Sequence, residues 1–123
     1  MALQGFLSRL GSARSGAEHW KLQRLTAVGL VVLAAWLVVS LVRIAGEPFE
    51  VVRAWLGGTF NATMMILTLV AGFWHARLGI QVIVEDYVHN PGWRVAALVL
   101  NDLLTFAFAT LGVVAVVTVA AGG

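Results

Sequence analysis

The sequence contains no cysteine and few charged residues. The lack of cysteine excludes disulfides, thiolate metal sites and covalent attachment of a c-type haem within this chain. Charged residues make up only 11% of the 123 residues, and hydrophobic residues make up 60%. Soluble domains are typically about 25% charged and about 45–50% apolar. The composition therefore argues against a water-soluble domain, and the length allows one domain over residues 1–123.

Long apolar stretches take the place of the missing charges. Three stretches contain at most one ionisable side chain each, namely residues 25–42, 54–76 and 95–123. Each can supply the roughly 20 residues that a helix needs to cross a hydrocarbon core of about 30 Å. We therefore predict an all-α membrane protein with three transmembrane helices. The predicted spans cover about residues 25–44, 54–84 and 94–121.

Basic residues gather before the first predicted span. Four Lys or Arg side chains precede it with a single acid, Glu18, whereas the charges of the two predicted loops cancel. Because cytoplasmic flanks carry the excess of basic residues, we predict a cytoplasmic segment at residues 1–23 and a periplasmic C-terminus. The net charge of +2 thus reflects topology and is not a nucleic-acid signal. We expect no signal-peptide cleavage, because the first apolar run exceeds the usual signal core of about 7–15 residues.

His75 is the only ionisable side chain of the second apolar stretch. Ionisable groups in lipid are costly and normally face a cavity, a partner or a cofactor. On a helical wheel with about 100° per residue, Gly72, Ala76 and Gly79 lie near His75 on one face. In one alternative, the commoner in membrane chains, this face is a packing groove and His75 hydrogen-bonds to a neighbouring helix. In the other, the groove receives a porphyrin and His75 ligates its iron.

Asp86 and Tyr87 follow at the inner end of the second predicted span. An unbroken helix would place Asp86 about 16 Å and Tyr87 about 18 Å nearer the cytoplasm than His75, with Asp86 on nearly the same face. A phenol at that depth can donate a hydrogen bond to a quinone carbonyl, and a carboxylate can orient an arginine or take up protons. Taken singly, an interfacial tyrosine anchor and a solvated loop acid are the plain alternatives.

Arg24 opens the first predicted span on the same side of the membrane, and His19 precedes it. A snorkelling arginine is the plain interpretation, but a guanidinium can also form a bidentate contact with a haem propionate. Two further polar residues are less informative. Asp102, in the third span, is either buried against a partner or wet at the interface, and His89 is typical of an exposed loop histidine.

Two runs of the sequence together resemble the D-type hydrophobic membrane anchor of bacterial succinate dehydrogenase, the succinate:quinone oxidoreductase of respiratory complex II. The first is His75-x(10)-Asp-Tyr at the end of the second of three spans. The second is the run His-Trp-Lys-Leu-Gln-Arg-Leu-Thr, which begins at His19 and opens the first span. The resemblance covers essentially the whole chain.

For the site, the resemblance implies a haem b shared with a C-type cytochrome b anchor subunit. This chain would then form half of a two-chain haem-binding helical bundle. The resemblance also implies that His75 is one axial ligand of the haem iron, and that Arg24 and His19 lie near the haem propionates. Tyr87 and Asp86 would contribute to a ubiquinone site.

For the function, the resemblance implies a subunit that is not an enzyme by itself. It would attach an iron–sulfur subunit and a flavoprotein subunit to the bacterial inner membrane. Electrons would pass there from succinate to ubiquinone, which links the tricarboxylic acid cycle to the respiratory chain. The alternatives are the anchor of a fumarate reductase or another quinone-linked cytochrome b complex, and a cofactor-free membrane scaffold. A small channel is disfavoured, because few polar side chains could line a pore.

Overall fold

Helices make up almost the whole chain. The computed structural model describes residues 2–122, without the side chains of residues 6–15 and 19. The described residues contain no strand, and their helices are α1 (Ala2–Ile44), α2 (Phe49–Gly57), α3 (Thr59–Tyr87) and α4 (Pro91–Ala120). Helices α3 and α4 and the Gly16–Ile44 part of α1 are each long and apolar enough to cross a membrane. The predicted all-α class with three membrane-spanning helices is therefore confirmed.

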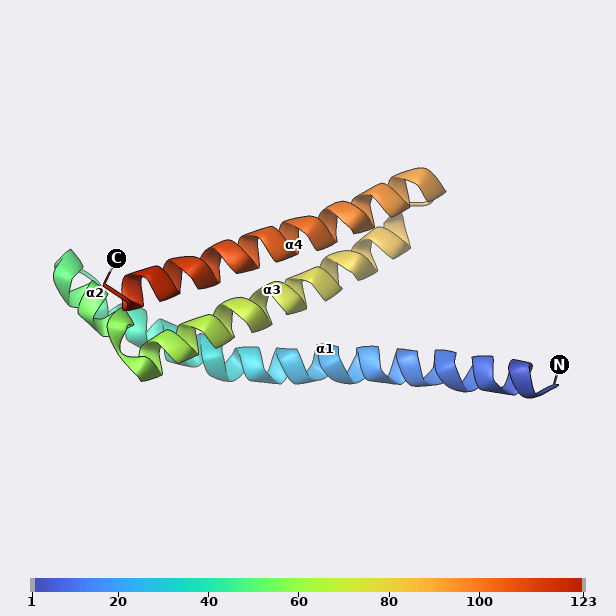
Figure 1. Ribbon diagram of the computed structural model, residues 1–123, viewed down its shortest axis with the longest axis horizontal. Helices are drawn as coiled ribbons and strands as arrows, with labels where there is room; N and C mark the ends of the chain where they lie inside the picture. Colours follow the sequence, from blue (N-terminus) through green and yellow to red (C-terminus); the bar gives the residue numbers. More distant parts are fainter. Residues whose placement is uncertain (1, 123) are drawn as a thin grey trace.

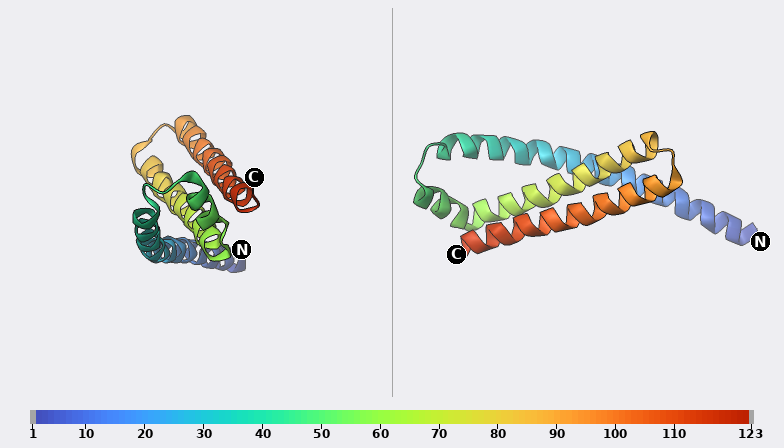
Figure 2. Two further views of the ribbon diagram at one scale, coloured as in Figure 1. Left: turned by 90° about the vertical axis from the view of Figure 1, so that its left-hand side faces the viewer. Right: turned by 90° about the horizontal axis from the view of Figure 1, so that it is seen from above.

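Helix α3 lies between α1 and α4 and packs against both (Figure 1, Figure 2). The first part of α1 extends past the end of the α3–α4 pair, and the C-terminus lies at the opposite end, next to α2 (Figure 1). Few side chains are covered. Among the described residues, the buried hydrophobic ones are Leu33, Leu78 and Val116. The other apolar side chains face outward at least in part, as expected for helices that are surrounded by lipid or by other subunits.

Helix α1 continues through the predicted boundary near residue 24 without a break. The first proline of the sequence is Pro48, so no proline interrupts the helix before that point. The predicted segment at residues 1–23 therefore differs from the span in composition and not in backbone structure. The predicted stop after the first span is confirmed. Helix α1 ends at Ile44, and Gly46 has a φ of 79°, a left-handed conformation that suits glycine after a helix.

The second span starts later than predicted. Residues from about 54 belong to α2, which ends at Gly57, and α3 begins only at Thr59. Gly58 between them is extended, with φ −66° and ψ 137°. Glycine has little helix propensity, so a helix breaks easily there. The break was not predicted, because glycine is neither strongly apolar nor strongly polar and does not interrupt an apolar stretch. Helix α2 instead folds back so that Trp55 stacks on Trp36 of α1, with ring centroids 5.9 Å apart.

The turn between α3 and α4 is closed by Asn90 and Pro91. The Asn90 side-chain oxygen accepts from the backbone N–H groups of Gly92 and Trp93 at 2.9 and 3.2 Å. Pro91 occupies the first turn of α4, where its missing N–H removes no helical hydrogen bond. Helix α4 therefore begins slightly before the predicted residue 94. This cap fixes the antiparallel pairing of α3 and α4.

Candidate functional site

His75 lies on the side of α3 that faces α1, and its ring is partly buried. Its Nδ1 is 3.2 Å from the hydroxyl oxygen of Thr26 on α1. A Cβ atom on Gly72 would lie 3.9 Å from Leu30 of α1, so Gly72 faces the same helix. The hydrogen bond to a neighbouring helix, which the packing alternative predicted, is confirmed. It engages Nδ1 alone, so ligation of iron by His75 stays a prediction.

An open cleft of about 270 Å³ lies beside His75, between α1 and α3. Its lining comes from one turn of α3 and two turns of α1: His75, Trp20, Gln23, Arg24 and Ala27. The guanidinium carbon of Arg24 lies 5.3 Å from the centre of the Trp20 ring, a cation–π contact that restrains an otherwise mobile side chain. The structure thus brings the predicted residues His75 and Arg24 to one cleft. His19, the other residue predicted near a propionate, has its side chain outside the described residues.

The described residues contain no group of three or more His, Asp or Glu side chains that could hold a metal ion. Among the described residues, His75 therefore belongs to no complete protein ligand set, and a metal ion bound to it would need ligands from other molecules. Haem iron has this requirement, because the porphyrin supplies the in-plane ligands and the protein supplies axial ones. The donor set around the cleft, one imidazole and one guanidinium, fits an axial ligand and a propionate partner.

The small residues near His75 do not form one groove, in contrast to the prediction. Gly72 faces α1, whereas Ala76 lines a second, apolar groove of about 420 Å³ between α3 and α4. Because α3 lies between two helices, residues only about 40° apart on its wheel contact different neighbours. A Cβ atom on Gly79 would meet nothing within 4 Å. The cleft beside His75 is lined by neither Gly72 nor Ala76.

Asp86 and Tyr87 form the last turn of an unbroken α3, as the sequence predicted. Both side chains are exposed, Tyr87 at 77%, and neither makes a hydrogen bond or ion pair with another described residue. Arg94 of α4 holds this end of α3, because its guanidinium donates to the backbone carbonyls of Glu85 and Val88 at 3.0 Å each. The Asp-Tyr pair is thus held on a fixed helix end while its polar groups stay accessible. It lies about 16 Å from His75 along the helix axis, at 1.5 Å per residue.

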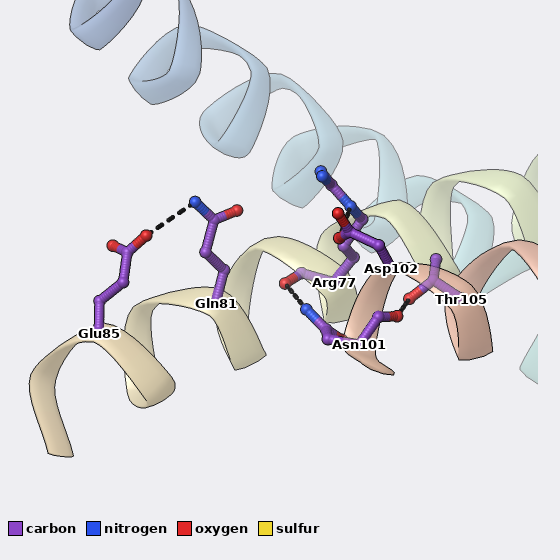
Figure 3. A network of polar contacts seen from close by, with 6 residues as sticks. All are labelled: Arg77, Gln81, Glu85, Asn101, Asp102 and Thr105. Carbon is purple, nitrogen blue, oxygen red and sulfur yellow. Dashed lines mark hydrogen bonds and ion pairs between the residues drawn. The ribbon is translucent and has the colours of Figure 1, made fainter. Parts of the chain in front are cut away.

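An ion pair that the sequence did not predict joins α3 to α4. Arg77 Nε donates to Asp102 Oδ1 at 2.7 Å, and the neighbouring Asn101, which is only 8% exposed, donates to the Arg77 carbonyl at 3.0 Å (Figure 3). Asp102 thus has an intramolecular partner that neither alternative named, while its side chain stays 46% exposed. The sequence did contain a signal for this ion pair. Arg77 and Asp102 lie at nearly equal sequence distances on either side of the turn at Asn90, so they lie side by side when the two helices pair antiparallel. The predicted exposure of His89 in that turn is confirmed.

Comparison with known proteins gives one family and several relatives. The family described as succinate dehydrogenase/fumarate reductase transmembrane subunit matches residues 7–120. The chain is 32% identical over 94 residues to the succinate dehydrogenase hydrophobic membrane anchor subunit of Rickettsia conorii, covering 76% of this chain and 75% of that protein. It is 28% identical over 113 residues to the subunit of the same name from Paracoccus denitrificans, covering 92% and 87%. A succinate dehydrogenase membrane anchor subunit of Reclinomonas americana is 33% identical over 90 residues, covering 71% of this chain and 75% of that protein. No solved structure gives a significant match.

Proposed function

Because this chain belongs to the succinate dehydrogenase/fumarate reductase transmembrane subunit family, we propose that it is the hydrophobic membrane anchor of a succinate:quinone oxidoreductase. In this role it would pair with a C-type cytochrome b anchor subunit in the bacterial inner membrane. The two anchors together would hold the iron–sulfur subunit and the flavoprotein at the cytoplasmic face. The convergence of His75 and Arg24 on the cleft between α1 and α3 is the observation that carries the proposal for the cofactor.

His75 and Arg24 would bind a haem b between this chain and the partner anchor. His75 would be one axial ligand, and the exposed Arg24 guanidinium would neutralise propionate charge. The cleft is open, so this chain would supply one wall and the partner subunit the other. When bound, haem b supplies a one-electron carrier inside the membrane. The protein's own contribution is to hold the imidazole in place, to pair the propionate charge and to exclude water.

Tyr87 and Asp86 would contribute to a ubiquinone site at the C-terminal end of α3. The Tyr87 hydroxyl is exposed and has no partner among the described residues, so it is available to donate a hydrogen bond to a quinone carbonyl. The Asp86 carboxylate would orient an arginine of a partner subunit or take up a proton that the quinone requires. Both groups would act with residues of other subunits, since α3 presents them outward.

The proposal is tested by a reduced-minus-oxidised optical spectrum of the purified complex. We expect His75→Ala to remove the haem b band, because the variant lacks the axial imidazole. His89→Ala is the matched control, since His89 is an exposed turn histidine on the other side of Tyr87. Loss of the band in both variants, or retention in both, would contradict the assignment of His75. Retention of subunit assembly without any haem in the wild-type complex would favour the cofactor-free scaffold.

A fumarate reductase anchor is the second candidate, and the family description names it directly. The anchor does not set the direction of electron flow, which depends on the flavoprotein, the iron–sulfur centres and the quinone. The ratio of succinate oxidation to fumarate reduction by the purified complex decides between the two. Faster reduction of fumarate by a low-potential quinol would favour the second candidate.

A further inference from the structure

The hydroxyl of Thr26 lies within hydrogen-bond distance of two groups, one on its own helix and one on α3. It donates to the backbone carbonyl of Gln23, one turn earlier in α1, at 3.0 Å. It also lies 3.2 Å from His75 Nδ1. A hydroxyl has one proton to donate, and a carbonyl can only accept. When the proton lies on the shorter bond, to Gln23, the Thr26 oxygen is left to accept a hydrogen bond from the imidazole.

This arrangement requires one particular tautomer of His75. If Thr26 accepts, then Nδ1 must carry the proton, and Nε2 keeps its lone pair. Among the described residues nothing hydrogen-bonds to Nε2. A neutral imidazole with a hydrogen-bonded Nδ1–H and a free Nε2 is the form in which histidine ligates a metal. The site is partly buried, so the bond is stronger than it would be in water.

We propose that Thr26 is a positioning residue, which holds His75 in the Nδ1–H tautomer and presents Nε2 as the ligand for the haem iron. The inference rests on the proposed function, because it assumes that His75 ligates iron. Helix α1 would then serve the cofactor twice, through Arg24 at the propionates and through Thr26 behind the axial ligand. The oxygen of Thr26 acts only through His75 and does not contact the cofactor.

Thr26→Val tests the proposal, because it keeps the branched shape and removes the acceptor. An outer partner of a metal-ligating histidine typically contributes about 10–100-fold to metal affinity. We therefore expect the variant complex to lose haem at least about 10-fold more readily in a transfer assay to an apo-acceptor protein. The haem reduction potential should rise, because an accepting partner makes the imidazole more basic and favours ferric iron. Thr26→Ser retains the hydroxyl and should match the wild type in both measurements.

Thr68→Val is the matched control. Thr68 also donates to a carbonyl one turn earlier, that of Met64 at 2.7 Å, but its hydroxyl makes no hydrogen bond to another helix among the described residues. It should leave haem retention and potential unchanged. If Thr26→Val does not assemble with its partner subunits, Thr26→Ala removes the same acceptor without adding a methyl group, and the same two measurements apply.

The two proposals fail separately. The positioning role is overturned if His75→Ala loses haem while Thr26→Val and Thr26→Ser both match the wild type in haem transfer rate and reduction potential. Thr26 would then only pack against the imidazole ring. If His75→Ala keeps its haem, the proposed axial ligand is wrong and the role of Thr26 falls with it. A raised potential in Thr26→Val, restored in Thr26→Ser, supports both.

Discussion

Single residues would carry the proposed chemistry of this chain, and most of the candidates could be picked out from the sequence by residue type and depth. His75 was singled out because an imidazole within an apolar stretch is costly, and Arg24 because it opens a span. What the sequence could not supply was the partner of each side chain. Thr26 was noticed only as part of the run that opens the first span, and no role was predicted for it, since a threonine in a membrane helix usually bonds to its own backbone. Its second contact, with His75, depends on how α1 packs against α3, which a helical wheel does not describe.

Tyr87→Phe should separate quinone chemistry from succinate oxidation. The substitution removes one hydroxyl from an exposed side chain, so it should not disturb folding. Loss of one hydrogen bond to the quinone, worth about 1–2 kcal/mol, should lower quinone reduction roughly 5–30-fold. Succinate oxidation with a soluble artificial acceptor should stay near the wild-type rate.

Trp93→Phe provides the control for Tyr87→Phe, because Trp93 is an exposed aromatic residue at the same end of the α3–α4 pair, at 72% exposure. It should leave both activities unchanged. A parallel fall of both activities in Tyr87→Phe would indicate failed assembly and would contradict a role for the phenol in quinone binding.

At the scale of helices, hydropathy predicted how many membrane spans there are, but it did not predict their ends or their neighbours. The start of α3 was missed because Gly57 and Gly58 fit the composition of a span while the backbone bends at Gly58. The face of small residues was misjudged for a related reason. Helix α3 lies between α1 and α4, so residues that share one side of its helical wheel contact different helices. The turn at Asn90 differs from these features, because Asn followed by Pro is a local signal that does not depend on how the helices pack.

The Arg77–Asp102 ion pair is expected to hold the register of α3 against α4. Asp102→Asn would leave the Arg77 charge unpaired among apolar helices, and an unpaired charge in a membrane helix is costly by about 2–3 kcal/mol. Since Asp102 is 46% exposed, we expect a smaller loss, roughly 1–2 kcal/mol. Thermal dissociation of the complex in detergent should shift to lower temperature.

The double variant Arg77→Met with Asp102→Leu tests whether the charge itself causes that loss. Removing both partners leaves no unpaired ion, so the dissociation temperature should return most of the way to the wild type. A double variant that is less stable than Asp102→Asn would show that the pair contributes more than mutual neutralisation, and it would contradict this account.

The whole molecule has too little interior to stand alone. Its helices form an open layer in which α3 alone contacts two long neighbours (Figure 2), and the buried hydrophobic residues among those described are Leu33, Leu78 and Val116. The cleft beside His75 is likewise open, so this chain encloses only part of any ligand bound there. Both features support the proposal that a second helical subunit would complete the fold and the site together.

Expression of the chain without its partner subunits should therefore yield little protein and no bound haem b. One axial imidazole and one wall of a pocket leave a porphyrin largely exposed to lipid and short of its second protein ligand. We expect a difference spectrum of membranes that contain the tagged chain alone to lack the haem b band, and coexpression with the C-type anchor to restore it. Restoration by the C-type anchor, without the iron–sulfur and flavoprotein subunits, would place the missing wall in that one partner. A stable monomer with one haem per chain would contradict the shared site, because the second axial ligand would then have to come from the same chain. Apart from His75, the histidine side chain that the described residues offer is His89, which lies in the distant turn.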